Sequence, residues 1–258
     1  MKQTSKYQGV KLSATQEDRV EDEIALEFPL NIIVNEQIIS ITMQTPGNEL
    51  ALARGLLFNE GICKEKTADW PHQVDTDSKT GYVTTIRFQL PESWLDKSVL
   101  SKRSLLSVSS CGICGTTQLK FPEGEIIAEK LPFNVGLVSQ LFQQLESKQS
   151  AFKASGGIHA AAIFNASLQM LSFAEDIGRH NAVDKCVGIV LENKSLHQGK
   201  FLLVSGRVSF EIISKCFTAG IPYLCAVSAP SSLSIDFAKE LGITLAGFCR
   251  EGRMTIYS

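Results

Sequence analysis

The sequence predicts an α/β protein in which a three-layer α-β-α sandwich follows a smaller α+β unit. Between about residues 156 and 248, short apolar runs of strand length alternate with amphipathic stretches of helical spacing. That alternation is typical of right-handed crossovers and a largely parallel sheet. Before residue 125, a hairpin and one helix precede a further strand instead. We therefore expect domains over residues 23–125 and 126–258, after a polar, flexible leader over residues 1–22.

The smaller domain is predicted to be a hairpin with a helix across it. The Asn35-Glu36 dipeptide separates two β-rich runs and suits a tight turn. After Pro46 and Gly47, apolar residues recur at helical spacing as far as Gly61, which can end the helix. The expected elements are strands over residues 24–28, 30–34, 37–43 and 81–90 and a helix over residues 49–60.

The larger domain contains the regular alternation of strands and helices. Asn134 is placed to cap a helix whose apolar residues begin at Val135. Gly156 and Gly157 lead into the first of five expected strands. Further helices are expected over residues 179–193, 209–219 and 231–241, and strands over residues 158–164, 168–174, 201–204, 221–227 and 243–248.

Composition excludes several classes of protein. The formal charge of -2 and the pI near 6.1 argue against a broad nucleic-acid surface. The first twelve residues lack the apolar run of a secretory signal, and no stretch reaches the ~18 apolar residues of a membrane helix. Seven cysteines, an odd number, are typical of free thiols in a reducing compartment. We expect a cytoplasmic protein without membrane or nucleic-acid partners.

Chemistry is concentrated in residues 107–117, which hold Cys111 and Cys114 among glycines and hydroxyl side chains and carry no charge. Gly112 and Gly115 allow tight bends that leave the sulfur atoms accessible. Two thiols at this spacing can chelate a metal, exchange a disulfide or carry a transferable sulfur atom. The spacing alone leaves these three possibilities open.

Arginines follow the predicted strands of the larger domain. Arg179, Arg207, Arg250 and Arg253 each stand beside glycine or serine at a strand end. Guanidinium groups bind phosphate oxygens, and small neighbours let the backbone approach a ligand. Because the carboxyl ends of parallel strands meet at one edge, these residues predict a site for a phosphorylated, nucleotide-like ligand. Ordinary helix capping with surface arginines is the alternative for each segment taken alone.

Two histidines accompany the arginines. His159 lies on an apolar strand, where a buried, hydrogen-bonded histidine is the common case. His180 opens a helix beside Arg179 and is the stronger candidate for contact with an anion. Nearby carboxylates have two interpretations, since they can orient these cations or serve helix dipoles and salt bridges. They are Glu175, Asp176, Asp184 and Glu211, with Lys185 and Lys215 as possible salt-bridge partners.

Taken together, these motifs resemble the FdhD family, which are sulfur-carrier accessory proteins for formate dehydrogenase. The resemblance covers nearly the whole chain from about residue 20. It rests on residues 53–61, 109–115, 175–185, 205–211, 228–230 and 247–257.

The resemblance implies a sulfurtransferase. A cysteine desulfurase would hand over a persulfide sulfur, which the protein would deliver to molybdenum or tungsten in a bis(guanine dinucleotide) pterin cofactor, activating formate dehydrogenase. Cys111 corresponds to the persulfide carrier and Cys114 to the second loop cysteine. It also implies a homodimer and a larger domain similar to cytidine deaminases. The cofactor-binding stretch corresponds to Phe248, Cys249, Arg250, Glu251, Gly252 and Arg253; the other expected contacts are Ser205, Gly206, Arg207, Arg179 and His180, with guanosine diphosphate as a mimic.

Other functions predict different observations. A zinc-bound or redox dithiol module could assist dehydrogenase assembly without sulfur transfer, although two cysteines supply only half of a structural zinc site. We predict no resident metal. Zinc deaminases need a His-x-Glu motif, whereas His159 is followed by Ala160 and Ala161. Deamination is therefore not expected.

Overall fold

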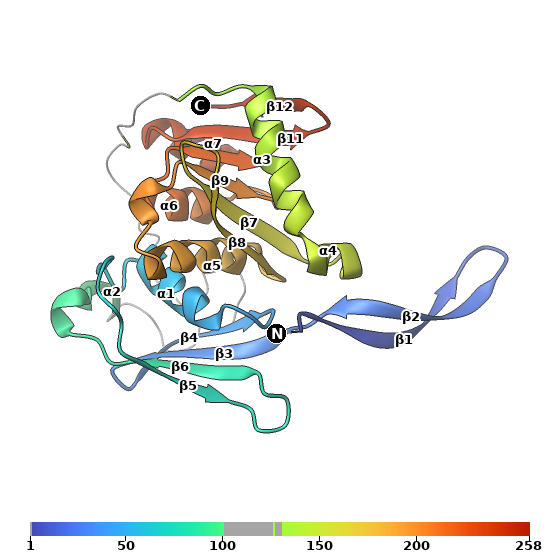
Figure 1. Cartoon of the computed structure of the whole chain (residues 1–258), viewed down its shortest axis with the longest axis horizontal. Coiled ribbons are helices and arrows are strands. Elements are labelled where there is room, and N and C mark those ends of the chain that lie inside the picture. The colour runs from blue at the N-terminus through green and yellow to red at the C-terminus, as the bar shows by residue number, and fades with distance from the viewer. Residues whose placement is uncertain (1, 101–125, 127–130) are drawn as a thin grey trace.

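The structure is a computed structural model that describes residues 2–100, 126 and 131–258. These residues form a six-stranded, a four-stranded and a two-stranded sheet (Figure 1). Cys111 and Cys114 lie outside the described residues. Among the helices that the structure describes, none is long and apolar enough to cross a membrane.

The six-stranded sheet belongs to the larger domain and has the order β12-β11-β10-β9-β7-β8. Its centre is parallel, since β10 pairs in parallel with both β9 and β11. The opening hairpin β7–β8 joins β9 antiparallel, and β12 closes the other side antiparallel to β11. The sheet is therefore mixed: the parallel strands after the opening hairpin were predicted, but the antiparallel strand β12 was not. The strands are β7 (His159–Phe164), β8 (Met170–Asp176), β9 (Phe201–Val204), β10 (Tyr223–Ala226), β11 (Thr244–Arg250) and β12 (Arg253–Ile256).

Helices cover both faces of this sheet, as predicted. The apolar strands alternate, so that Ala160, Ala162 and Phe164 face one layer and Ala161 and Ile163 the other. Burial on both faces explains why these strands are nearly continuous apolar runs. One layer contains α3 (Val135–Lys148) followed by α4 (Ser150–Ser155), and the other contains α5 (Arg179–Glu192), α6 (Phe210–Thr218) and α7 (Ser232–Glu240). A 3-10 turn, η2 (Leu196–Gln198), precedes β9.

The four-stranded sheet forms the smaller domain, with α1 packed across it. The Asn35-Glu36 turn has positive φ at both residues and joins β3 to β4, as the predicted hairpin requires. Strand β5 was missed because its residues are exposed and polar. The elements are β3 (Phe28–Val34), β4 (Gln37–Gln44), α1 (Glu49–Asn59), β5 (His72–Thr76), β6 (Val83–Phe88), η1 (Glu92–Trp94) and α2 (Lys97–Leu100), in the sheet order β4-β3-β6-β5.

Glycines allow a close approach where α1 crosses α5. A Cβ atom at Gly55 would lie 1.8 Å from the backbone oxygen of Asp184. One at Gly188 would lie 1.8 Å from the backbone oxygen of Ala51. Helix α1 is therefore held between its own sheet and α5, at a separation that only glycine permits at these two positions (Figure 1).

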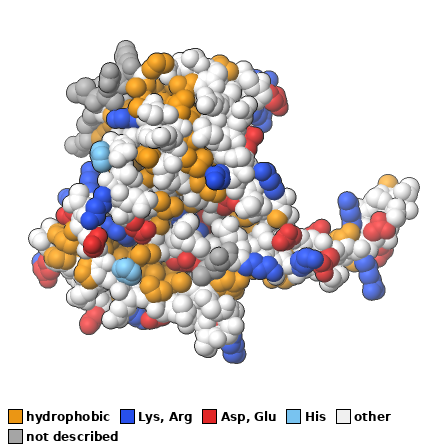
Figure 2. Space-filling model, in the orientation of Figure 1, with side chains coloured by type: hydrophobic (Ala, Val, Ile, Leu, Met, Phe, Trp, Pro, Cys, Tyr) orange, Lys and Arg blue, Asp and Glu red, His pale blue; other side chains and the backbone are white. Residues whose placement is uncertain are grey.

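The predicted leader is a hairpin instead of a loose segment. Strands β1 (Thr4–Leu12) and β2 (Glu17–Ala25) pair antiparallel and project from the body of the protein (Figure 1). Acidic and basic side chains line it (Figure 2), and Lys6 pairs with Glu21 across the strands at 2.7 Å. The prediction failed because both faces are polar, so no apolar alternation marks the strands. The residues of this hairpin add little to the core, as expected.

Candidate functional site

The candidate site lies along the carboxyl edge of the six-stranded sheet, the edge at which the parallel strands β9, β10 and β11 end. Strand β8 ends here too, because His159 at the start of β7 pairs with Asp176 at the end of β8. A methyl group on Gly206, just after β9, would lie 3.3 Å from both Arg179 Cδ and His159 Nδ1. Three predicted segments therefore meet at this edge.

His159 is half-buried beside two arginines. Burial lowers the pKa of its imidazole, and repulsion by Arg179 and Arg207 lowers that pKa further, although Asp176 opposes both effects. The Nε of Arg179 is itself buried without a hydrogen-bond partner among the described residues. A neutral imidazole next to guanidinium groups keeps the positive charge of the edge on the arginines.

The C-terminal hairpin brings two more arginines together. Glu251 and Gly252 form a two-residue turn in which both φ angles are positive, at 54° and 69°. Arg250 and Arg253 flank that turn as a cross-strand pair. Directly opposite residues of a hairpin share one face, so the turn places both guanidinium groups over the same region. Arg253 also contacts the Glu251 carboxylate at 2.7 Å.

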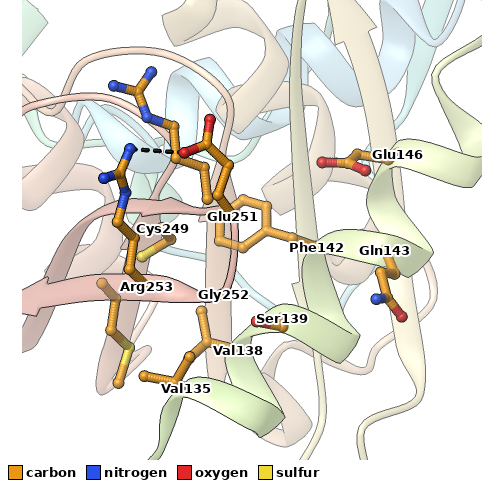
Figure 3. Close-up of a pocket in the computed structure, with 12 residues that line it drawn as sticks. Val135, Val138, Ser139, Phe142, Gln143, Glu146, Cys249, Glu251, Gly252 and Arg253 are labelled. Atoms are coloured by element: carbon orange, nitrogen blue, oxygen red, sulfur yellow. Dashed lines mark hydrogen bonds and ion pairs between the residues drawn. The ribbon is translucent and has the colours of Figure 1, made fainter.

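A pocket of about 330 Å³ separates this hairpin from α3 (Figure 3). One wall is the hairpin, which includes Cys249, and the other is the surface of α3. In Figure 3 the hairpin contributes Cys249, Glu251, Gly252 and Arg253, and α3 contributes Val135, Val138, Ser139, Phe142, Gln143 and Glu146.

A second pocket of about 670 Å³ adjoins the first and shares Phe142 and Glu146 with it. It reaches the carboxyl edge, since His159 and Ser205 also line it. Its walls include the apolar side chains of Leu145, Phe152, Ile158 and Val227. We call the two pockets together the α3 groove. It combines an arginine-bearing end with an apolar end, which suits a long ligand that carries both charged groups and flat rings.

The structure brings together some of the predicted binding residues but not all. Five of the six residues of the C-terminal stretch line the first pocket, whereas Phe248 is absent from both linings. Ser205 lines the second pocket, where its hydroxyl also accepts a hydrogen bond from Ala160 N–H at 2.9 Å. Arg207 is exposed, and Arg179 stands beside Gly206 and His159.

His180 occupies a different environment from the one predicted. It is 4% exposed, and its Nε2 lies 3.2 Å from Ser209 Oγ and 3.9 Å from the Glu211 carboxylate. Neither pocket of the α3 groove is lined by His180. The structure therefore assigns this residue to the packing between α5 and α6.

The acidic residues of the edge have structural roles. Glu175 accepts hydrogen bonds from the first N–H groups of α4, at Ala151 and Phe152. Asp176 forms a fully buried ion pair with Lys185 at 2.7 Å, and Asp184 binds Lys215 at 2.8 Å. The salt-bridge interpretation is thus the one observed.

The contribution of α3 and α4 to the site was not predicted from the sequence. Helix α3 was expected only as an amphipathic helix capped by Asn134, whose side chain does accept a hydrogen bond from Leu137 N–H at 3.0 Å. The polar side of that helix presents Ser139, Gln143 and Glu146 at spacings of four and three residues, which places them on one face. That spacing was the available signal, but a polar helix face normally contacts only water.

The described residues after the Cys-x-x-Cys segment lie at the opposite edge of the sheet. Ile126 N–H binds the carbonyl of Leu241, which ends α7, and Leu131 N–H binds the hydroxyl of Tyr223 at the start of β10. Cys111 lies fifteen positions before Ile126 in the sequence, outside the described residues.

Comparison with known proteins places the chain among close relatives. The profile of the FdhD/NarQ family matches residues 25–258. The chain is 37% identical to the sulfur carrier protein FdhD of Nocardia farcinica, with 99% of this chain and 93% of that protein covered. It is 39% identical to the protein of that name from Streptomyces coelicolor (92% and 87% covered). It is 38% identical to that from Saccharolobus solfataricus (92% and 89% covered).

A solved structure has the same fold. It is the crystal structure of a candidate formate dehydrogenase accessory protein from Desulfotalea psychrophila, which superposes with a TM-score of 0.76. The match covers 100% of this chain and 97% of that one at 20% sequence identity. At that level of identity the likeness supports the fold alone.

Proposed function

The chain belongs to the FdhD/NarQ family, and from this membership we propose that it is a sulfur carrier that serves a formate dehydrogenase. It accepts the terminal sulfur of a persulfide from a cysteine desulfurase on Cys111. It then transfers that sulfur to the metal of a molybdenum bis(molybdopterin guanine dinucleotide) cofactor, which is its substrate. The observation that carries the proposal is identity of 37–39% to proteins named sulfur carrier protein FdhD along nearly the whole chain.

The α3 groove supports this choice of substrate. Arg250 and Arg253 offer paired guanidinium groups to diphosphate oxygens, in a chain whose overall charge is negative. The apolar end, with the rings of Phe142 and Phe152, offers surfaces for a flat purine or pterin. The transfer itself needs sulfur chemistry, and a thiolate attacks the terminal sulfur of a persulfide donor without any net oxidation.

Incubation with a cysteine desulfurase and free cysteine is expected to add one sulfur atom, about 32 Da, to the peptide that holds Cys111. The physical reason is that the thiolate is the nucleophile in sulfur transfer, and the residues next to Cys111 in the sequence are small and uncharged. Peptide mass spectrometry measures the adduct. The Cys111→Ser variant should lose it, while Cys186→Ser, at a buried position, should retain it.

An adduct confined to other cysteines would remove Cys111 from the proposal. Stoichiometric zinc in the purified protein, lost in the Cys111→Ser variant, would instead favour the zinc-bound module. Both measurements use the same wild-type sample. A sulfur carrier should show the adduct on Cys111 and no stoichiometric zinc, whereas a metal-bound interaction module should show zinc and no adduct.

Guanosine diphosphate is expected to bind in the α3 groove, and Arg253→Ala should weaken that binding by about 1–3 kcal/mol, the value of a charge-assisted hydrogen bond. Isothermal titration calorimetry gives the dissociation constants. Arg87→Ala is the matched control, because Arg87 is an exposed arginine that also pairs with a carboxylate, Asp75 at 3.0 Å, but lies on the smaller sheet. Equal affinities for the Arg253→Ala variant and wild type would exclude this arginine from the site.

A further inference from the structure

Two thiols meet at the base of the arginine-bearing pocket. Cys249 lines that pocket, and Cys225 lies behind it on the neighbouring strand β10, within the apolar cluster beneath α3. The Cys225 thiol and the backbone N–H of Ala226 are the hydrogen-bonding partners of the Cys249 sulfur. The bulge in β11 between Gly247 and Arg250 turns Cys249 into this position.

The other described cysteines line neither pocket of the α3 groove. Cys186 donates its S–H to the carbonyl of Ala161 at 3.1 Å, and Cys216 donates to the carbonyl of Ile221 at 3.2 Å. Both are fully buried in the apolar core. Burial favours the protonated thiol at such positions, whereas Cys249 lines a pocket that also holds two arginines.

The pKa values follow this contrast. The hydrogen bond from Cys225 lowers the pKa of Cys249, with help from Ala226 N–H and against the effect of burial. Burial raises the pKa of Cys63 to about 11 and that of Cys186 to about 12. Cys225 has its pKa raised because it is the donor of the shared hydrogen bond and is buried. Among the described cysteines, Cys249 thus has the greatest thiolate character near neutral pH.

The pocket leaves room for a second sulfur atom on Cys249. Its volume of about 330 Å³ is roughly ten times the ~30 Å³ that one water molecule occupies in the liquid. Guanidinium groups stabilise a nearby persulfide anion, and Arg250 and Arg253 line the same pocket. A sulfur atom held on Cys249 would therefore lie within the space assigned to the phosphorylated ligand.

We propose that Cys249 is a second sulfur-accepting residue, which takes a sulfane sulfur from a persulfide donor inside the α3 groove, with Cys225 as its positioning residue. The inference rests on the proposed sulfur-carrier function. The Cys249 thiolate attacks the terminal sulfur of the donor R–S–SH and forms a new S–S bond. The donor's S–S bond breaks, R–S⁻ leaves, and the product is Cys249–S–SH. One S–S bond replaces another, so the step needs no external oxidant or reductant.

The test treats a folded Cys111→Ser/Cys114→Ser variant with cysteine persulfide as a small-molecule donor and maps the added sulfur by peptide mass spectrometry. We expect the adduct on Cys249, with Cys63, Cys186 and Cys216 unmodified in the same digest. Guanosine diphosphate at saturating concentration should decrease the labelling of Cys249, because it would occupy the same pocket. An absence of sulfur on Cys249 in this variant would overturn the proposal.

Variants of Cys225 test its positioning role. Cys225→Val keeps a buried apolar side chain but removes the hydrogen-bond donor, and it should lower the labelling rate of Cys249 at neutral pH by more than twofold, because the thiolate loses a hydrogen bond. Cys225→Ser retains a donor and should keep the rate within about twofold of that of the parent. Equal rates for the valine and serine variants would eliminate the role of Cys225.

The same experiment separates this inference from the sulfur-carrier proposal. Wild-type protein is incubated in parallel with a cysteine desulfurase and cysteine. Sulfur on Cys111 in that sample, with none on Cys249 in the cysteine persulfide sample, would refute only the further inference. Sulfur on Cys249 from cysteine persulfide, with none on Cys111 from the desulfurase, would refute only the assignment of Cys111.

Discussion

Replacing Lys215 by methionine is expected to lower the free energy of unfolding by about 3–5 kcal/mol, the usual cost of breaking a buried ion pair. The Lys215 ammonium contacts both carboxylate oxygens of Asp184, at 2.8 and 2.9 Å, and Glu60 at 3.3 Å. The Lys215 and Asp184 side chains are only 5% and 2% exposed. Without the ammonium, Asp184 retains, among the described residues, only the Asn59 amide, at 2.7 Å, as a polar side-chain partner. Urea unfolding monitored by circular dichroism measures the loss.

Two further variants identify the cause of that loss. The double variant Asp184→Asn/Lys215→Met removes both charges, and we expect it to recover most of the lost stability, because no unpaired charge remains buried. Lys6→Met breaks an exposed ion pair with Glu21 on the hairpin and should change stability by less than about 1 kcal/mol. A double variant as unstable as Lys215→Met alone would attribute the loss to packing and not to the unpaired charge.

Gly188→Ala is expected to destabilise the protein by about 3 kcal/mol, at or above the upper end of the ~1–3 kcal/mol range typical of overpacking. The added methyl group would overlap the backbone oxygen of Ala51, 1.8 Å away on α1. Since backbone atoms cannot rotate away, α1 and α5 must separate, and the helix propensity gained from alanine offsets only about 1 kcal/mol. Thermal unfolding should show a lower midpoint by several degrees.

Gly136→Ala is the matched control for this contact. It lies in α3, where a methyl group would meet only the Asn134 side-chain oxygen, at 3.3 Å. We expect this variant to unfold within about 1 kcal/mol of wild type, since a side chain can adjust and alanine favours the helix. If Gly188→Ala were as stable as Gly136→Ala, the close crossing of α1 and α5 would not contribute to stability.

The core elements of the larger domain could be predicted because local patterns and tertiary contacts agree there. Strand β9 was predicted at its observed bounds, and the Asn134 cap of α3 makes the expected hydrogen bond. Strand β12 was not, because the two-residue turn at Glu251 and Gly252 contains only one glycine and follows an irregular strand end. In the sequence, a polar turn flanked by charged residues looks the same as a loop that follows the last strand.

The site was predictable in part for a related reason. Parallel strands with arginines at their ends require those arginines to lie near one edge, and Arg179 beside Gly206 agrees with this rule. The rule gives no information on which helix covers that edge, so α3 and its Glu146 were missed. The position of His180 at a helix N-terminus is compatible with both a ligand and a neighbouring helix, and the structure places it against α6. The contact with Ser209 depends on packing between α5 and α6 that sequence spacing does not encode.

The ion pair between Glu251 and Arg253 affects which anions the protein can discriminate. Arg253 already has a carboxylate neighbour on its own turn, so a singly charged ion such as acetate replaces one carboxylate with another and gains little. A doubly charged diphosphate competes more strongly, and it can engage Arg250 at the same time. Under the proposed function, competition of this kind would favour a diphosphate over monovalent anions in the pocket.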